Sequence, residues 1–148
     1  MAESVKDKLV GTWRLLRWIY RDDAGNEVDY FGKGAVGILM YDAYGNMNAQ
    51  LMRANRQAFA SQSINGGTPQ ETKAAFDSYI AYFGKYIETT PGEIVHMVEG
   101  SLFPNWFKDH QLRYATLVKN ELKLSTPPVP VNGGTMVFEV TWERVTNG

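Results

Sequence analysis

Short runs of hydrophobic residues, separated by turn sequences, make up most of this chain. The runs are rich in Val, Ile, Leu, Tyr, Trp and Thr, and sequences such as DDAGN at 22–26, DAYGN at 42–46 and TTPGE at 89–93 lie between them. β-Branched and aromatic residues favour strands, whereas Gly, Asn, Asp and Pro favour turns. The absence of βαβ alternation argues against a parallel sheet and favours an antiparallel meander. The pattern predicts strands over roughly 9–21, 27–31, 35–41, 46–53, 84–89, 93–101, 111–118, 121–126 and 135–145, with a long turn-rich segment, PPVPVNGG, at 127–134.

One segment, TPQETKAAFDSYIAYFG, has the spacing of a helix instead. Thr68 is a suitable N-cap, Pro69 occupies the first helical position, and Glu71 completes a capping box. Gly84 follows as a C-terminal stop signal. An apolar face is predicted by the three- and four-residue spacing of Ala75, Phe76, Tyr79, Ile80 and Phe83. We therefore expect one helix over about 68–83, which would lie near one mouth if the strands close into a barrel.

Length and composition favour a single domain over residues 1–148, with a core at 9–145. The 15 basic and 16 acidic residues give a net charge of −1, which disfavours nucleic acid as a partner. There is no cysteine, and hence neither a disulfide framework nor a thiolate nucleophile. Neither a signal-peptide pattern nor an apolar run of about 18 residues is present. We expect a cytoplasmic protein with no membrane partner.

No motif predicts a cofactor or a metal. GKGAVG at 32–37 matches a dinucleotide fingerprint, but a predicted strand follows it where that site needs a helix. His96 and Glu99 form H-x-x-E on a predicted strand, where alternation points the two side chains to opposite faces. They cannot share a metal on a regular strand. Either His96 or Glu99 faces the interior, and the sequence leaves open which one.

Further candidates depend on which face of each strand is inside. Regular alternation from Trp13 would place Arg17 in the interior, where a guanidinium needs a carboxylate or an acidic or carbonyl-bearing ligand. A bulge would turn Arg17 outward, and Arg113 presents the same choice. On 46–53, one face carries Asn48, Gln50 and Met52, whereas the other is apolar, so the interior wall is either polar or apolar.

The two ends of the chain carry a family resemblance. LVGTWRLL contains Gly11 and Trp13 of a G-x-W element, and FEVTWERV places Arg144 where a basic residue packs over that Trp in lipocalins. Together with GILMYDAYGNMNAQLMR, HMVEGSLFPNW and LKLSTPP, across roughly 9–145, this series resembles the small bacterial and fungal lipocalin-like domain proteins. The resemblance implies an all-β fold, a closed antiparallel barrel of eight to ten strands in the lipocalin (calycin) arrangement, with a cavity for one small molecule.

The resemblance also implies a function. Lipocalin-like barrels encoded with biosynthetic pathways include cyclases, so we expect a small hydrophobic natural product to bind in the cavity. We expect its cyclisation there without a cofactor, by a reaction such as a hetero-Diels–Alder addition in secondary-metabolite biosynthesis. Such a step needs a shaped apolar cavity and one or two polarising donors. The alternatives are a non-catalytic carrier or sensor, and a cofactor-free isomerase or dehydratase using an inward carboxylate. A homodimer is left open.

Two groups of candidate site residues follow from this expectation. The catalytic candidates are His96, Glu99, Arg17 and Arg113. The ligand-binding candidates are Gln50, Met52, Tyr79, Tyr82, Phe83, Trp106 and Phe107.

Overall fold

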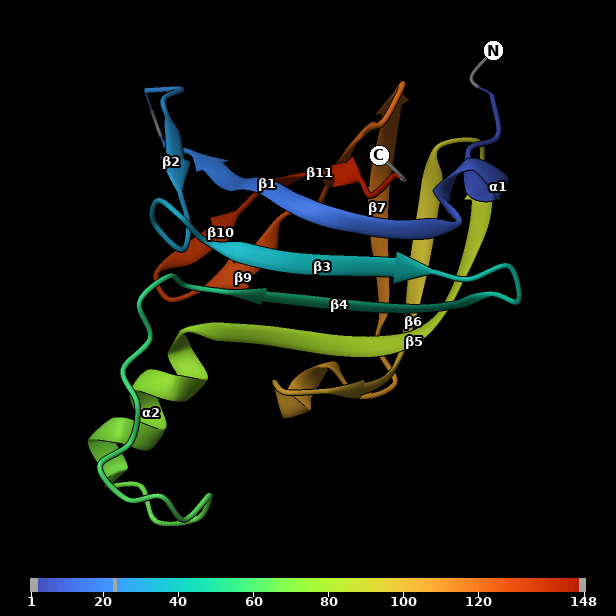
Figure 1. Cartoon of the computed structure of the whole chain (residues 1–148). Helices are drawn as coiled ribbons and strands as arrows, with labels where there is room; N and C mark the ends of the chain where they lie inside the picture. The colour runs from blue at the N-terminus through green and yellow to red at the C-terminus, as the bar shows by residue number, and fades with distance from the viewer. Residues whose placement is uncertain (1–2, 23, 147–148) are drawn as a thin grey trace.

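Eight strands of the described chain close into an antiparallel barrel (Figure 1). The computed structural model describes residues 3–22 and 24–146. The barrel strands, in chain order, are β1 (Gly11–Arg21), β3 (Val36–Tyr41), β4 (Asn46–Met52), β5 (Tyr79–Thr90), β6 (Glu93–Ser101), β7 (His110–Val118), β8 (Glu121–Ser125) and β11 (Phe138–Arg144). Each strand pairs with its neighbours in the order β11-β8-β7-β6-β5-β4-β3-β1, and pairing of β1 with β11 closes the ring. A short extra strand, β2 (Glu27–Asp29), pairs with the end of β1. The predicted closed antiparallel barrel is confirmed.

The interior wall is apolar where the sequence left the choice open. On β4 the buried side chains are Met47, Ala49 and Leu51, whereas Gln50 is exposed and Met52 is half-buried on the other face. Inward apolar residues at every second position remove a continuous hydrophobic surface from water.

One end of the barrel is closed by the residues that carried the family resemblance. Trp13 is fully buried, and its indole nitrogen donates to the carbonyl of Leu9 (2.9 Å) at the end of the short helix α1 (Lys6–Leu9). Arg144 pairs with Trp13 in the β1–β11 register and lies over its ring. Gly11 has a φ of 139°, and a Cβ there would lie 3.1 Å from Arg144 Nη1, so a larger residue would crowd the guanidinium.

The N-terminus of the predicted helix is confirmed, whereas its predicted C-terminus lies too far along the chain. Helix α2 spans Pro69–Asp77, and the Thr68 capping box with Glu71 is present. From Tyr79 the chain is strand β5, paired with β4, so the predicted helix end at residue 83 is wrong. The sequence YIAYFGKYIE alternates between inward and outward side chains, and cross-strand pairing outweighs the helical spacing that the same aromatic residues also show.

The C-terminal third also differs from the expected strands. The segment predicted as a long turn holds a hairpin of β9 (Val129–Val131) and β10 (Gly134–Met136), which pair only with each other among the described strands. The strand expected over 135–145 is therefore divided, and its barrel portion begins at Phe138. A single 3₁₀ turn, η1 (Pro104–Trp106), lies between β6 and β7.

The long connections gather at one end of the barrel, which we call the open end. Antiparallel pairing places the connections 22–35, 53–78, 102–109 and 126–137 there, and the short turns 42–45, 91–92 and 119–120 at the other end. Helix α2 lies beside the open end and projects away from the wall (Figure 1). Among the described residues, no helix has the length and apolar character that crossing a membrane requires.

Candidate functional site

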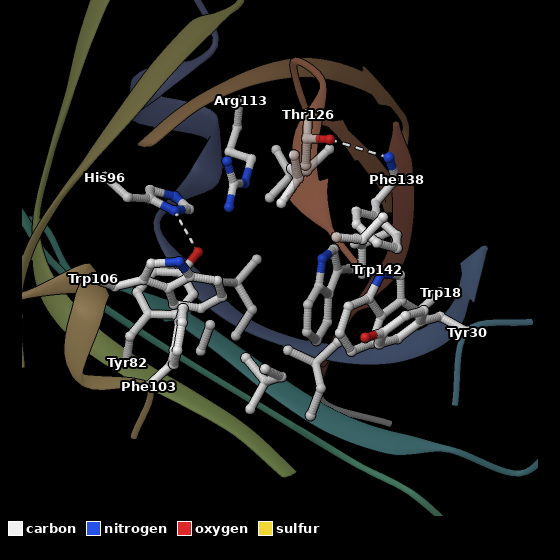
Figure 2. Close-up of a pocket in the computed structure, with 18 of the residues that line it drawn as sticks. Trp18, Tyr30, Tyr82, His96, Phe103, Trp106, Arg113, Thr126, Phe138 and Trp142 are labelled. Atoms are coloured by element: carbon white, nitrogen blue, oxygen red, sulfur yellow. Dashed lines mark hydrogen bonds between the residues drawn. The ribbon is translucent and has the colours of Figure 1, made fainter. Parts of the chain in front are cut away.

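A cavity of about 240 Å³ occupies the half of the barrel nearest the open end (Figure 2). Leu39, Ala49, Leu51, Leu124 and Val140 contribute aliphatic wall. The aromatic side chains that line it are Trp18, Tyr30, Tyr82, Phe103, Trp106, Phe138 and Trp142. Three further side chains bring polar atoms: His96, Arg113 and Thr126. Among the described residues, no Asp or Glu lines this cavity.

His96 is the most deeply buried of these polar residues, with 1% of its surface exposed. Its Nε2 lies 2.7 Å from the Tyr41 hydroxyl on β3, and its Nδ1 lies 2.8 Å from the Tyr82 hydroxyl on β5. A neutral imidazole donates from one nitrogen and accepts at the other, so one tyrosine accepts and the other donates. Both ring nitrogens are occupied, and a bound ligand would meet the Tyr82 hydroxyl rather than a free histidine nitrogen.

The buried position sets the charge of this group. Burial lowers the pKa of His96 well below 6.5, and the positive charge of Arg113 lowers it further, so the ring is neutral at pH 7. Burial raises the pKa of Tyr41 and of Tyr82, while Arg113 opposes the rise in both. The Tyr41–His96–Tyr82 group is therefore uncharged at pH 7.

Arg113 is the cation of the cavity. It lies on β7, adjacent to the strand of His96, and its guanidinium points into the space between the two aromatic clusters in Figure 2. One amino group donates to Gln111 Oε1 (2.8 Å) and the other to the carbonyl of Leu112 (2.9 Å). Both acceptors are neutral. Among the described residues, no carboxylate oxygen lies within 4.0 Å of the Arg113 side chain.

Two aromatic clusters face each other across the cavity. In a ring of eight strands, the strand four places away is opposite, so β11 faces β5 and β1 faces β6. On one side, Tyr82 and Trp106 pack edge to face, with their ring centres 5.7 Å apart. On the other side, Trp18 packs against Tyr30, with ring centres 4.6 Å apart, next to Trp142 (Figure 2). The space between these walls suits a flat apolar molecule.

The second cluster holds unpaired donors. The indole nitrogens of Trp18 and Trp142 are buried and have no hydrogen-bond partner among the described residues. An unsatisfied buried donor costs about 1–3 kcal/mol. This side of the cavity thus offers two free hydrogen-bond donors.

The open end of the cavity is bordered by two irregular segments. Val129, Pro130 and Val131 of the β9–β10 hairpin line the cavity. The base of this hairpin is fixed to the barrel, because Thr126 N donates to the Phe138 carbonyl (3.0 Å) and Phe138 N donates to Thr126 Oγ1 (3.0 Å). In the β6–β7 connection, Phe103 packs against Trp106 of η1, with their ring centres 5.6 Å apart. The hairpin and η1 therefore both border the cavity at this end.

Four of the residues proposed from sequence face the cavity, namely Tyr82, His96, Trp106 and Arg113. His96 is inside and Glu99 is exposed on the outer face, so alternation along β6 holds. Arg17 is also exposed, because a bulge between Leu15 and Arg17 shifts the register of β1 and brings Trp18 inward instead.

The structure places the other five candidates outside the cavity. Tyr79 donates a hydrogen bond to Gln50 on the outer face of β4 and β5. Met52 is half-buried on that face. Phe83 is 54% exposed, and Phe107 is 58% exposed beyond η1. The shift of residues 79–83 from helix to strand explains Tyr79 and Phe83, since alternation sends odd-numbered residues of β5 outward there.

Several cavity residues were missed at the sequence level: Trp18, Tyr30, Phe103, Thr126, Phe138 and Trp142. Aromatic residues on strands carry no mark that separates core from cavity wall, and the bulge that turns Trp18 inward leaves no sequence signal. Trp142 could have been found, because it lies two residues before Arg144 and shares its strand face. In the ranges 3–22 and 24–146, no three His, Asp or Glu side chains lie close enough to hold a metal ion.

Comparison with known proteins agrees with this architecture. A family profile described as "Lipocalin-like domain" matches residues 10–145. The chain is also similar to the 4'-hydroxy-3'-methoxypropiophenone carrier protein of Aspergillus oryzae, with 30% identity over 107 residues. That alignment covers 67% of this chain and 96% of the fungal protein.

Proposed function

The chain is a member of the lipocalin-like domain family, and from this premise we propose that its barrel holds one small, flat, largely apolar molecule as a non-catalytic carrier or binding protein. The observation that carries this proposal is the cavity between two aromatic clusters, whose lining includes residues of η1 and of the β9–β10 hairpin. Apolar, concave sites with a few placed polar groups are the usual form of small-molecule sites.

The volume limits the ligand. A cavity of about 240 Å³ lies just below the usual range for small-molecule sites, which begins at about 300 Å³. Two or three fused or linked aromatic rings are about the largest ligand for such a space, which does not suit a long lipid. The similar Aspergillus oryzae protein is named as the carrier of an aromatic ketone, which supports both the carrier role and this ligand class.

Fluorescence of N-phenyl-1-naphthylamine, a neutral aromatic dye, tests the proposal. The dye should bind one site per chain and brighten as it leaves water. Ala49→Phe places a large side chain in the cavity and should abolish the signal, because Ala49 lines it. Asn48→Phe is the matched control, since Asn48 is the neighbouring residue on the outer face of β4 and lies outside the lining.

Two outcomes would contradict binding in the barrel: no saturable signal with the wild-type protein, or equal loss of signal in both variants. Circular dichroism should show that both variants keep the β-sheet signal, so that loss of binding in Ala49→Phe reports a filled cavity.

A cofactor-free cyclase is the second candidate, and one observation favours it. Arg113 and the Tyr82 hydroxyl face the same apolar space, where both could donate to a substrate carbonyl and accelerate a pericyclic addition. His96 would hold the Tyr82 hydroxyl in place through its Nδ1 contact. A substrate with a conjugated diene and an α,β-unsaturated carbonyl should then cyclise faster with protein than in buffer, and Tyr82→Phe should reduce the rate. Equal rates and product ratios in protein and buffer would exclude this activity.

The isomerase or dehydratase alternative loses its acid–base group. It required an inward carboxylate, and Glu99 lies on the outer face of β6. With no Asp or Glu lining the cavity in the described chain, proton abstraction by a carboxylate there has no structural support.

A further inference from the structure

The positive charge in the cavity has no negative partner among the described residues. Arg113 brings one positive charge, His96 is neutral, and no described Asp or Glu lines the cavity to offset it. Most inward-facing arginines in apolar surroundings are paired with a carboxylate, since an unpaired buried charge is strongly unfavourable. Here the two acceptors of Arg113 are the neutral oxygens of Gln111 and Leu112.

Arg113 is nevertheless held in place. Gln111 is itself buried, with 8% of its surface exposed, and fixes one amino group. The Leu112 carbonyl fixes the other amino group. A guanidinium has five N–H donors, and these two bonds leave the remaining donors for other acceptors. The side chain is therefore oriented and partly unsatisfied, as expected of a group that binds a ligand.

The groups around Arg113 are neutral, so none of them offsets its charge. The Tyr82 hydroxyl lies close enough to Arg113 for the guanidinium to act on its pKa. Across the cavity, the Trp18 and Trp142 indole nitrogens are unpaired donors. A neutral hydrocarbon that filled this space would displace the water that solvates Arg113 and would leave the charge without a partner. A ligand bearing a negative oxygen would supply it.

We infer that the natural ligand is an aromatic acid whose anionic oxygen group, of which a carboxylate is the simplest case, pairs with Arg113 while its ring lies between the two aromatic clusters. This inference rests on the proposed function and narrows it, since it names the charge of the ligand. A guanidinium binds a carboxylate through two parallel N–H bonds, and charge-assisted bonds of this kind are about twice as strong as neutral ones.

Isothermal titration calorimetry with naphthalene-2-carboxylate and naphthalene-2-carboxamide tests the inference at pH 7. The two probes share shape and size and differ in charge. The wild-type protein should bind the carboxylate at least about tenfold more tightly, since loss of one partner of a desolvated charge pair costs at least that much. Arg113→Gln should remove the preference, and Arg113→Lys should retain part of it because the charge remains.

Arg17→Gln is the matched control, because Arg17 is exposed on the outer face and the same substitution there should leave the preference intact. Equal affinities of the wild-type protein for both probes, or a preference that survives Arg113→Gln, would overturn the inference. Should Arg113→Gln fail to fold, the ratio of carboxylate to carboxamide affinity in the wild-type protein and in Arg113→Lys still tests the inference.

Failure of this inference is separable from failure of the proposed function. If the wild-type protein binds N-phenyl-1-naphthylamine saturably but does not prefer the carboxylate, the anionic ligand is contradicted and the binding role stands. If it binds none of the three probes, both the anionic ligand and the binding role are contradicted.

Discussion

Arg144 lies over the indole ring of Trp13, with the guanidinium carbon 4.3 Å from the ring centre. The same guanidinium donates to the carbonyls of Val10 (2.9 Å) and Lys8, just beyond and within helix α1. One side chain thus covers the most buried tryptophan and satisfies carbonyl groups that a helix end leaves free.

Arg144→Met should lower the free energy of unfolding by about 2 kcal/mol, because it removes a cation–π contact and two charge-assisted hydrogen bonds while keeping an apolar cover on Trp13. Urea denaturation followed by tryptophan fluorescence measures the loss. Arg17→Met is the control, since Arg17 is exposed and makes none of these contacts, and it should change stability by less than about 0.5 kcal/mol. Equal effects of the two substitutions would mean that Arg144 contributes no more than an ordinary surface arginine.

The closed end of the barrel was predictable because its residues act through short, fixed spacings. Gly11, Trp13 and the pairing of Trp13 with Arg144 need only a regular antiparallel register between the first and last strands. The N-terminus of α2 was predictable for the same reason, since the capping box involves Thr68 and Glu71 alone.

The cavity was less predictable because tertiary pairing decides which residues face it. The bulge between Leu15 and Arg17 exchanges an expected arginine for Trp18, and nothing local in the sequence requires it. Tyr79 and Phe83 fit a helix by spacing and a strand by alternation, and only the partner strand β4 decides between the two. The choice between His96 and Glu99 has the same origin, since alternation excludes one of them without saying which.

The stability of the protein should fall as the pH falls from 6.5 to 5, owing to His96. Its folded-state pKa is lowered by burial, so in this window the unfolded chain binds a proton that the folded protein does not. His96 therefore contributes stability above pH 6.5 and loses it below, at up to about 1.4 kcal/mol per pH unit. Urea denaturation at several pH values measures this slope.

Two variants assign the slope to His96. His96→Gln keeps an amide that can bridge Tyr41 and Tyr82, and it should flatten the pH dependence between 6.5 and 5. His110→Gln should leave it unchanged, since His110 is exposed at the start of β7. A wild-type slope that persists in His96→Gln would contradict this origin.

Ligand binding should slow hydrogen exchange in the β9–β10 hairpin. Val129 and Val131 line the cavity, while β9 and β10 pair only with each other in the described structure, so a bound molecule adds contacts to a weakly supported element. Hydrogen-exchange mass spectrometry with and without N-phenyl-1-naphthylamine checks this. Residues 42–45, a turn at the closed end, serve as the internal control and should exchange at the same rate in both samples. Uniform slowing of both segments would indicate global stabilisation instead of a contact with the hairpin.

Gly84→Ala should be strongly destabilising, although the reason differs from the helix stop signal expected from the sequence. Gly84 is buried in β5 at a bulge against β6, and a Cβ there would lie 2.0 Å from the carbonyl oxygen of Met97 and 2.9 Å from the amide nitrogen of Glu99. Both contacts are to backbone, so the strands must separate locally, at a cost of about 1–3 kcal/mol. Because the bulge lies two residues from Tyr82, the distortion should also weaken binding of N-phenyl-1-naphthylamine.

Gly25→Ala is the control for Gly84→Ala, because the added methyl group meets nothing within 4 Å and only the left-handed backbone, with a φ of +84°, opposes it. That strain amounts to about 1 kcal/mol, and Gly25 lies in the exposed turn after β1, so dye binding should be unchanged. If both variants lost stability equally and both kept the affinity of the wild-type protein, the close β5–β6 approach at Gly84 would play no part in shaping the cavity wall.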